Sequence, residues 1–100
     1  MLFMVVSTHS PEACPIVNPT TKEKLISASQ RMEDVAKSLG VSILGSWADM
    51  AAHTTFMLLD APKPEALGKM SIELHLVDWS TSTVHPVATM EESMAVLQAQ

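Results

Sequence analysis

The opening strand is the feature that most restricts how this chain can fold. The segment Leu2–His9 is rich in β-branched and large apolar residues and stops at Ser10-Pro11, which predicts a β-strand. Both faces of this strand are apolar over most of their length: Leu2, Met4, Val6 and Thr8 on one, Phe3, Val5, Ser7 and His9 on the other. A strand with one wet face alternates apolar with polar residues, so we expect this strand to be covered on both sides.

Length and composition indicate one globular domain over residues 1–100. The chain is 47% hydrophobic and 17% charged, which is too apolar for a disordered protein. Its formal charge of −5 and the lack of a basic run argue against a nucleic-acid partner. No apolar run approaches the roughly 20 residues that span a bilayer, and the start of the chain lacks the positive region of a signal peptide. With a single cysteine, a reducing and cytoplasmic location is expected.

The middle of the chain predicts a long helix followed by a hairpin. Apolar residues recur at helical spacing over Thr21–Leu39, Thr20 and Glu23 form a capping-box pattern, and Gly40 is a suitable C-terminal stop. Two strands, Val41–Asp49 and Thr54–Leu59, are then expected, joined by a turn over Met50–His53.

The last third of the chain predicts a helix, a strand and a short tail helix. Helix formation is expected to begin near Pro64 and to continue to Val77, although Ile72–Leu76 also alternates like a strand. The strand Thr81–Ala88 contains Pro86, which limits it to the edge of a sheet or its own end. The sequence Thr89–Glu92 has the pattern of a second capping box, and Met90, Met94 and Leu97 line one face of the tail. Such a short helix must dock on its own domain or on a partner.

This order of elements predicts a ferredoxin-like α+β fold. The β-α-β-β-α-β sequence forms a four-stranded antiparallel sheet with its helices on one face, followed here by the C-terminal helix. The other face would then expose apolar residues, which we expect to be Phe3, Val5, Ile43, Trp47 and either Phe56 or Met57. A second copy packed face to face would cover them, so a homodimer is expected.

Two short motifs add a family resemblance. The element order, the size, Gly45-Ser46-Trp47-x-Asp49 in the second strand and the closing Val84-His85-Pro86-Val87 are similar to small dimeric α+β-barrel families. These families are relatives of the antibiotic-biosynthesis monooxygenase and muconolactone isomerase superfamily. The resemblance implies a dimer, and a range of activities that includes cofactor-free oxygenases, isomerases, haem-handling enzymes and nickel binders. Fold analogy alone does not choose among them.

The expected fold brings several reactive side chains to one end of the sheet. The first two strands run in the same direction and the third begins where they end. His9, the Glu12–Cys14 loop and His53 should therefore lie together, with His75 joining them if the second helix ends there. His85 lies within the last strand, far from His9.

Metal binding is the first interpretation of this group. Imidazole and thiolate ligands suit nickel, zinc or copper, and the candidate ligands are His9, Cys14, His53 and His75. Glu12 would serve as an oxygen ligand or orient a histidine. The spacing between His9 and Cys14 matches no strong metal signature, and ordinary loop histidines beside a small buried cysteine are the more common explanation of such a pattern.

Two other interpretations use the same residues. Cys14 could act as a nucleophile if the loop brought it to a helix N-terminus or to His9. Alternatively, His9, His53 and Asp49 could perform cofactor-free acid–base chemistry beside an apolar cavity lined by Trp47, Phe56 and Met57. The sequence therefore predicts a small cytoplasmic homodimeric binding protein with a transition-metal site, or a small cofactor-independent enzyme at the same place.

Overall fold

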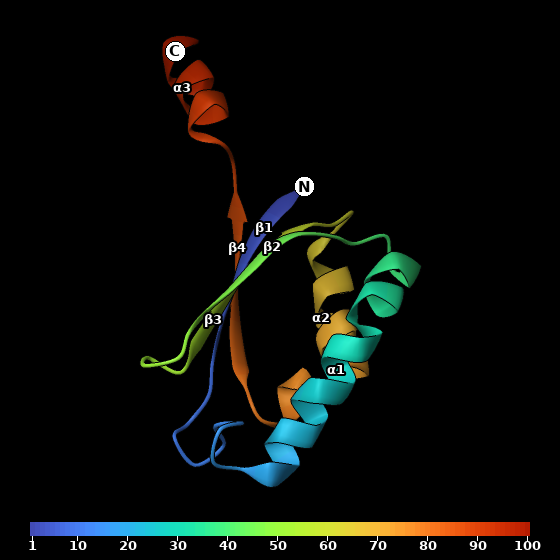
Figure 1. Ribbon diagram of the computed structural model, residues 1–100. Coiled ribbons are helices and arrows are strands. Elements are labelled where there is room, and N and C mark those ends of the chain that lie inside the picture. The colour runs from blue at the N-terminus through green and yellow to red at the C-terminus, as the bar shows by residue number, and fades with distance from the viewer.

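The computed structural model describes all residues, Met1–Gln100, and has the expected order of elements (Figure 1). They are β1 (Leu2–Thr8), α1 (Pro19–Ser38), β2 (Ser42–Asp49), β3 (Thr54–Asp60), α2 (Pro64–Glu73), the single 3₁₀ turn η1 (Leu76–Asp78), β4 (Thr81–Val87) and α3 (Met90–Gln98). The sheet order is β2-β3-β1-β4 and every neighbouring pair is antiparallel. The ferredoxin-like prediction is confirmed, and Pro86 lies in an edge strand as expected.

Helices α1 and α2 cover one face of the sheet and enclose the core (Figure 1). Phe3 of β1 and Leu74 at the end of α2 are the largest fully buried side chains. The remaining core residues come from both helices, from β3 and from the residues that flank β2 and β3: Ala28, Val35, Ala36, Val41, Leu59, Ala61, Ala66, Leu67 and Met70. No helix of the chain combines the length and the apolar character needed to cross a membrane.

The face of the sheet away from the helices agrees only in part with our prediction. Phe3, Val5 and Ile43 pack toward the helices instead of lying on the uncovered face. The uncovered side, which we call the open face, carries Trp47 of β2 and Phe56 of β3, as predicted. Its other apolar residues are Leu2, Met4 and Val6 of β1 and Leu58 of β3. Because both faces of β1 are apolar, the sequence did not determine which of them meets the helices.

A β-bulge in β2 explains why Ile43 and Trp47 lie on opposite faces. The pairing of β2 with β3 shifts between Ile43 and Gly45, so that one extra residue interrupts the alternation of side chains. Trp47 consequently pairs with Phe56 on the open face. A side chain at position 45 would collide with the indole ring of Trp47, so the tryptophan packs over a bare glycine backbone.

Local backbone geometry explains two helix boundaries that differ from the prediction. Helix α1 starts earlier than predicted: the N-cap is Asn18, whose Oδ1 accepts a hydrogen bond of 3.1 Å from Thr21 N, and Pro19 occupies the first turn. Helix α2 ends at Glu73 and does not reach Val77, because His75 adopts a left-handed conformation with φ of 56°. His75 therefore lies on neither a helix nor a strand.

Helix α3 extends from the end of β4 and stands clear of the sheet and the other helices (Figure 1). The predicted capping box is present, since Thr89 Oγ1 accepts a 3.0 Å hydrogen bond from Glu92 N. The apolar side chains of α3 are exposed, including Leu97 at 60% and Met90 at 76%. Nothing within the chain covers this helix.

Candidate metal centre

The strand register places His9 directly opposite His53. Thr8 and Thr54 form the last pair between β1 and β3, so the residues that follow and precede them face each other. His9 N donates a backbone hydrogen bond of 3.2 Å to His53 O. Their side chains are also in contact: Nε2 of His9 lies 3.3 Å from Nδ1 of His53, and the rings meet edge to face at 78°. The prediction that these two histidines share one end of the sheet is confirmed.

The turn between β2 and β3 holds His53 in an uncommon conformation. His53 has a φ of 51°, in the left-handed region that residues other than glycine seldom occupy. The turn is closed by Asp49, whose Oδ1 accepts a hydrogen bond of 3.2 Å from Ala52 N. A conformation of this kind costs on the order of 1 kcal/mol and commonly marks a functional position.

Cys14 is held by a tightly folded loop between β1 and α1. Its carbonyl oxygen accepts hydrogen bonds from Val17 N at 3.0 Å and from Asn18 N at 2.8 Å, while Cys14 N donates to Pro11 O at 3.3 Å. The cysteine side chain is buried and forms no disulfide. Because Asn18 also caps α1, the loop and the helix fix the position of the thiol together.

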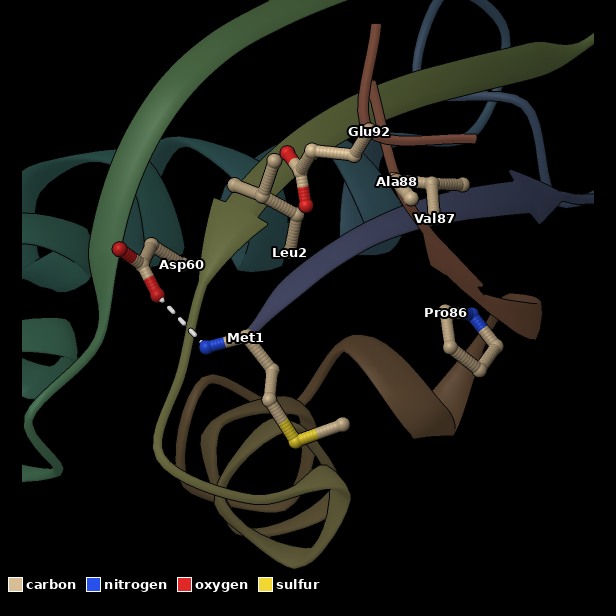
Figure 2. Close-up of a pocket in the computed structure, with 7 residues that line it drawn as sticks. All are labelled: Met1, Leu2, Asp60, Pro86, Val87, Ala88 and Glu92. Atoms are coloured by element: carbon tan, nitrogen blue, oxygen red, sulfur yellow. Dashed lines mark hydrogen bonds and ion pairs between the residues drawn. The ribbon is translucent and has the colours of Figure 1, made fainter. Parts of the chain in front are cut away.

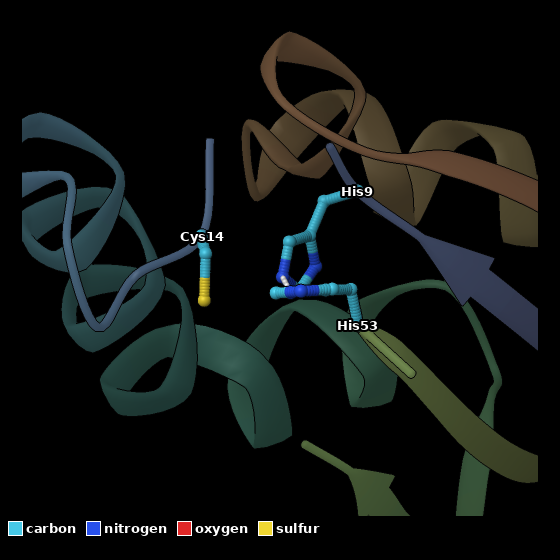
Figure 3. A group of neighbouring side chains, drawn as sticks. All are labelled: His9, Cys14 and His53. Atoms are coloured by element: carbon cyan, nitrogen blue, oxygen red, sulfur yellow. Dashed lines mark hydrogen bonds between the residues drawn. The ribbon is translucent and has the colours of Figure 1, made fainter. Parts of the chain in front are cut away.

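These three side chains form one group at the end of the sheet, drawn in Figure 3. The donor atoms of His9, Cys14 and His53 all lie within 4.8 Å of one another. In a tetrahedral site with metal–nitrogen distances of about 2.0–2.1 Å, two ligand nitrogens are about 3.3–3.4 Å apart. The two imidazole nitrogens, at 3.3 Å, already have this separation. A thiolate belongs about 3.6 Å from each nitrogen, so starting from separations of up to 4.8 Å, a bound ion would draw Cys14 inward by at most about 1.2 Å.

The surroundings favour the neutral form of His9. Partial burial, and then the adjacent imidazole of His53, lower the pKa of His9 below its ordinary value of 6.5. A neutral imidazole is the form that binds a metal, so the environment of His9 prepares it as a ligand at neutral pH.

A mostly apolar cavity of about 250 Å³ lies beside the group. His9, Cys14 and His53 contribute to its wall, as does Asp49. The other lining residues come from the loop, from α1 and from the hairpin: Pro15, Ile16, Leu25, Ala48, Met50, Thr54 and Thr55. A small molecule in this cavity would contact the imidazoles directly.

Trp79 is a neighbour of the site that the sequence analysis did not identify. Its indole ring packs against the imidazole of His9 with centroids 5.6 Å apart, and its buried Nε1 has no hydrogen-bond partner. The pairing of β1 with β4 is what could have identified Trp79. Because Thr8 pairs with Thr81, the residues just before β4 lie beside His9. Trp79 does not line the cavity of about 250 Å³, so its contact with His9 lies outside that space.

Other residues considered from the sequence lie outside the group. His75 is 63% exposed, and its Nδ1 lies 3.4 Å from Asp78 Oδ2. Lys24 hydrogen-bonds the same carboxylate at 3.0 Å, and this bond foremost lowers the pKa of Asp78. Glu12 is exposed and binds through its backbone, where its carbonyl oxygen accepts a hydrogen bond from Asn18 Nδ2.

The aromatic residues expected around the cavity also lie elsewhere. Trp47 and Phe56 are paired on the open face because of the bulge in β2, and neither lines the cavity. Met57 faces a separate cleft between the sheet and α2. His85 lies within β4 opposite Met4, away from the group as predicted.

Comparison with known proteins supports the fold and assigns a family. The crystal structure of SCO4226 from Streptomyces coelicolor A3(2) is similar with a TM-score of 0.62 and 22% identity, over 89% of this chain and 98% of that one. A candidate transposase from Deinococcus radiodurans R1 is similar with a TM-score of 0.50 and 11% identity, over 99% and 88% of the two chains. At these identities the likeness concerns the fold alone. No curated protein matches the chain. A family model matches residues 1–100, and the chain therefore belongs to the family described as a domain of unknown function, DUF3303.

Proposed function

We propose that this protein is a small homodimeric binding protein that holds one transition-metal ion per chain with His9, Cys14 and His53. The observation that carries the proposal is the convergence of the three donor atoms within 4.8 Å from two segments far apart in the sequence. Backbone hydrogen bonds hold the Cys14 loop in its fold and join His9 to His53. The three ligand side chains are therefore close together without a bound ion.

The donor set indicates which ions to expect. Two imidazoles and one thiolate suit zinc, nickel or copper, whereas magnesium and calcium prefer oxygen ligands. With two neutral imidazoles and one thiolate, the site would retain a net charge of +1 around a divalent ion. Three protein ligands also leave a tetrahedral ion with a free position, as in sites that bind or activate a further molecule.

A second function, that of a small enzyme without a cofactor, is favoured by the cavity beside the histidines. A space of about 250 Å³ admits a small organic molecule. The contact between His9 Nε2 and His53 Nδ1 would let one imidazole act as base while the other holds the proton. This alternative fits the oxygenase and isomerase relatives of the proposed superfamily, and it requires no bound metal.

The proposed dimer forms through the open face of the sheet. Its apolar residues are too numerous to lie in water in a small protein, and Trp47 alone is 56% exposed. A face-to-face dimer of ferredoxin-like domains is the arrangement of the α+β-barrel families that the sequence resembles. We place the protein in the cytoplasm, where a free cysteine ligand stays reduced.

Metal analysis of the untagged protein tests the first proposal. We expect close to one equivalent of zinc, nickel or copper per chain and a rise in the melting temperature when the ion is added to stripped protein. His53→Gly should abolish metal binding, and Cys14→Ser should weaken it while the fold remains intact.

His75→Gly is the matched control for His53→Gly. Both histidines have a positive φ, so both substitutions relieve the same backbone conformation, but only His53 belongs to the group. Equal metal binding by the wild type and His53→Gly would contradict the metal proposal. If no ion raises the melting temperature while a small organic ligand protects His9 from chemical modification, the enzyme alternative is favoured instead.

A further inference from the structure

The C-terminal helix α3 presents an apolar stripe that its own chain does not cover. Met90, Met94 and Leu97 recur at helical spacing and share one side of the helix. All three are exposed, Met94 least at 44%. Figure 1 shows α3 continuing beyond β4, away from the sheet and from α1 and α2.

An isolated helix of this length is not stable in water. Helices shorter than about 12–15 residues are marginal even when their sequence favours helix formation. The nine residues of α3 gain a cap from Thr89 but no tertiary contact that would offset the entropy of ordering them. Its stability must therefore come from a surface that the single chain does not supply.

A hollow at the base of α3 could receive such a helix. It has a volume of about 470 Å³ and is drawn in Figure 2. Its lining residues come from the start of β1, the ends of β3 and β4, and the first turn of α3: Met1, Leu2, Asp60, Pro86, Val87, Ala88 and Glu92. Leu2 pairs with Val87, and both belong to the open face, so the hollow adjoins the open face. The hollow is mostly apolar, with the carboxylates of Asp60 and Glu92 in its wall.

The stripe of α3 cannot fill the hollow of its own chain. Glu92 lines the hollow, and at 100° per residue it lies on the side of the helix opposite Met90, Met94 and Leu97. Turning the stripe inward would require rotating the helix by about half a turn and breaking the cap at Thr89. The stripe therefore faces outward, toward a neighbouring molecule.

We propose that α3 is an exchanged arm: in the dimer, the stripe of each copy docks on the hollow and the adjoining open face of the other copy. The proposal rests on the proposed dimer and adds that α3 of each copy contacts the other copy. A second copy is the partner because the contact is self-complementary: one two-fold axis docks both arms at once.

The distribution of charge agrees with a second copy as the partner. The chain has a formal charge of −5, so two copies repel each other through most of their surface. The acidic residues on the open face are Asp49 and Asp60, at opposite ends of the sheet, and Asp60 is paired with the N-terminal amine. There is no lysine or arginine on this face: its other strand positions are apolar, Gly, Ser, Thr or His85. Two copies can therefore approach through this face without opposing rows of like charge.

Hydrogen exchange at several protein concentrations tests the arm, with the mass measured by light scattering at each. We expect amides of α3 to exchange at least about tenfold more slowly in the dimer than after dilution to the monomer. Leu97→Glu should remove this protection and weaken dimerisation about tenfold or more, because it places a charge in the stripe. Ala95→Glu adds the same charge on the other side of α3 and should change neither.

Each alternative gives a different result. Protection of α3 that does not depend on concentration would mean that the helix folds onto its own chain, and would overturn the arm. A dimer whose α3 amides stay unprotected, and which Leu97→Glu does not weaken, would overturn the arm while leaving the proposed dimer in place. A protein that is monomeric at every concentration would refute the dimer and the arm together, without affecting the metal site.

Discussion

His9 is the side chain with the most partners at the candidate centre. Its ring contacts His53 on one side and Trp79 on another, and its backbone amide is bonded to the β2–β3 turn. Because these contacts bury part of the imidazole, the pKa of His9 lies below its ordinary value. This lowered pKa of His9 affects both metal affinity and the stability of the folded chain.

The stability of the metal-free protein should depend on pH through His9. The pKa of His9 in the folded chain is below the 6.5 expected when unfolded, so the unfolded chain takes up this proton more readily as the pH falls. We expect the free energy of unfolding to decrease as the pH drops below about 6.5. Urea unfolding of stripped protein between pH 7.5 and pH 5 at about half-unit steps would measure this.

His9→Gln should make this decrease smaller, whereas His85→Gln, within β4 and away from the group, should retain it. A profile that is unchanged by His9→Gln would show that another group is responsible. Metal should also be released over the lower part of the same range, since protons and the ion compete for the imidazole nitrogens.

At the scale of single elements, the loop between β1 and α1 shows how caps decide boundaries. The sequence offered Thr20 with Glu23 as a capping box, but Asn18 lies two residues earlier and directly before a proline. Proline fits the first turn of a helix because its fixed φ suits that turn and its missing amide is not needed there. The earlier start also ties the cap to the Cys14 loop, through the bond from Asn18 N to Cys14 O.

We therefore expect Asn18→Ala to lower the free energy of unfolding by about 1–2 kcal/mol. Thr20→Ala, at the position that the sequence pattern favoured, should change it by less than about 0.5 kcal/mol. Chemical unfolding of the two variants beside the wild type compares them directly. If Thr20→Ala proves to be the more damaging substitution, the helix begins where the capping-box pattern indicated.

The β-bulge in β2 has a larger effect than its one residue suggests. It moves Trp47 to the open face while Ile43 packs toward the core. Two residues of β2 that simple alternation would put on the same face therefore lie on opposite faces of the sheet. Gly45 is required at this point because the indole of Trp47 occupies the space of a side chain. The Gly45-Ser46-Trp47 motif thus allows the indole ring of Trp47 to pack on the open face.

At the scale of the whole molecule, the single chain is an elongated body with extents of 53 × 31 × 17 Å. Helix α3 adds to this length because it projects beyond the end of the sheet (Figure 1). One layer of helices covers one face only, and the chain itself covers neither the open face nor α3. The candidate metal centre and the proposed arm lie at opposite ends of the sheet, so each can be changed without the other.

Trp47→Glu should convert the dimer to a monomer, because it places a charge in the centre of a desolvated interface. Ile26→Glu is the control: Ile26 is 47% exposed on α1, on the other layer of the molecule, and should leave the dimer intact. Light scattering at micromolar concentration measures both. A wild-type mass of one chain, 10.8 kDa, would refute the dimer at that concentration.

The sequence by itself determined the order of the elements and hence the fold. Helical spacing, β-rich runs and turn residues are local signals, and the handedness of β-α-β connections leaves few ways to join them. The same logic brought His9 and His53 to one end of the sheet, because antiparallel strands of known order leave only a small range of registers.

Only the tertiary structure decided which faces and which partners these residues have. A strand that is apolar on both sides, such as β1, does not reveal which side meets the helices, and a bulge cannot be located from alternation alone. The left-handed conformation of His75 ended α2 early and left that histidine beside Asp78 instead of at the centre. Trp79 reached His9 through the pairing of β1 with β4. Contacts between segments distant in the chain depend on packing, and packing is settled by the whole molecule together.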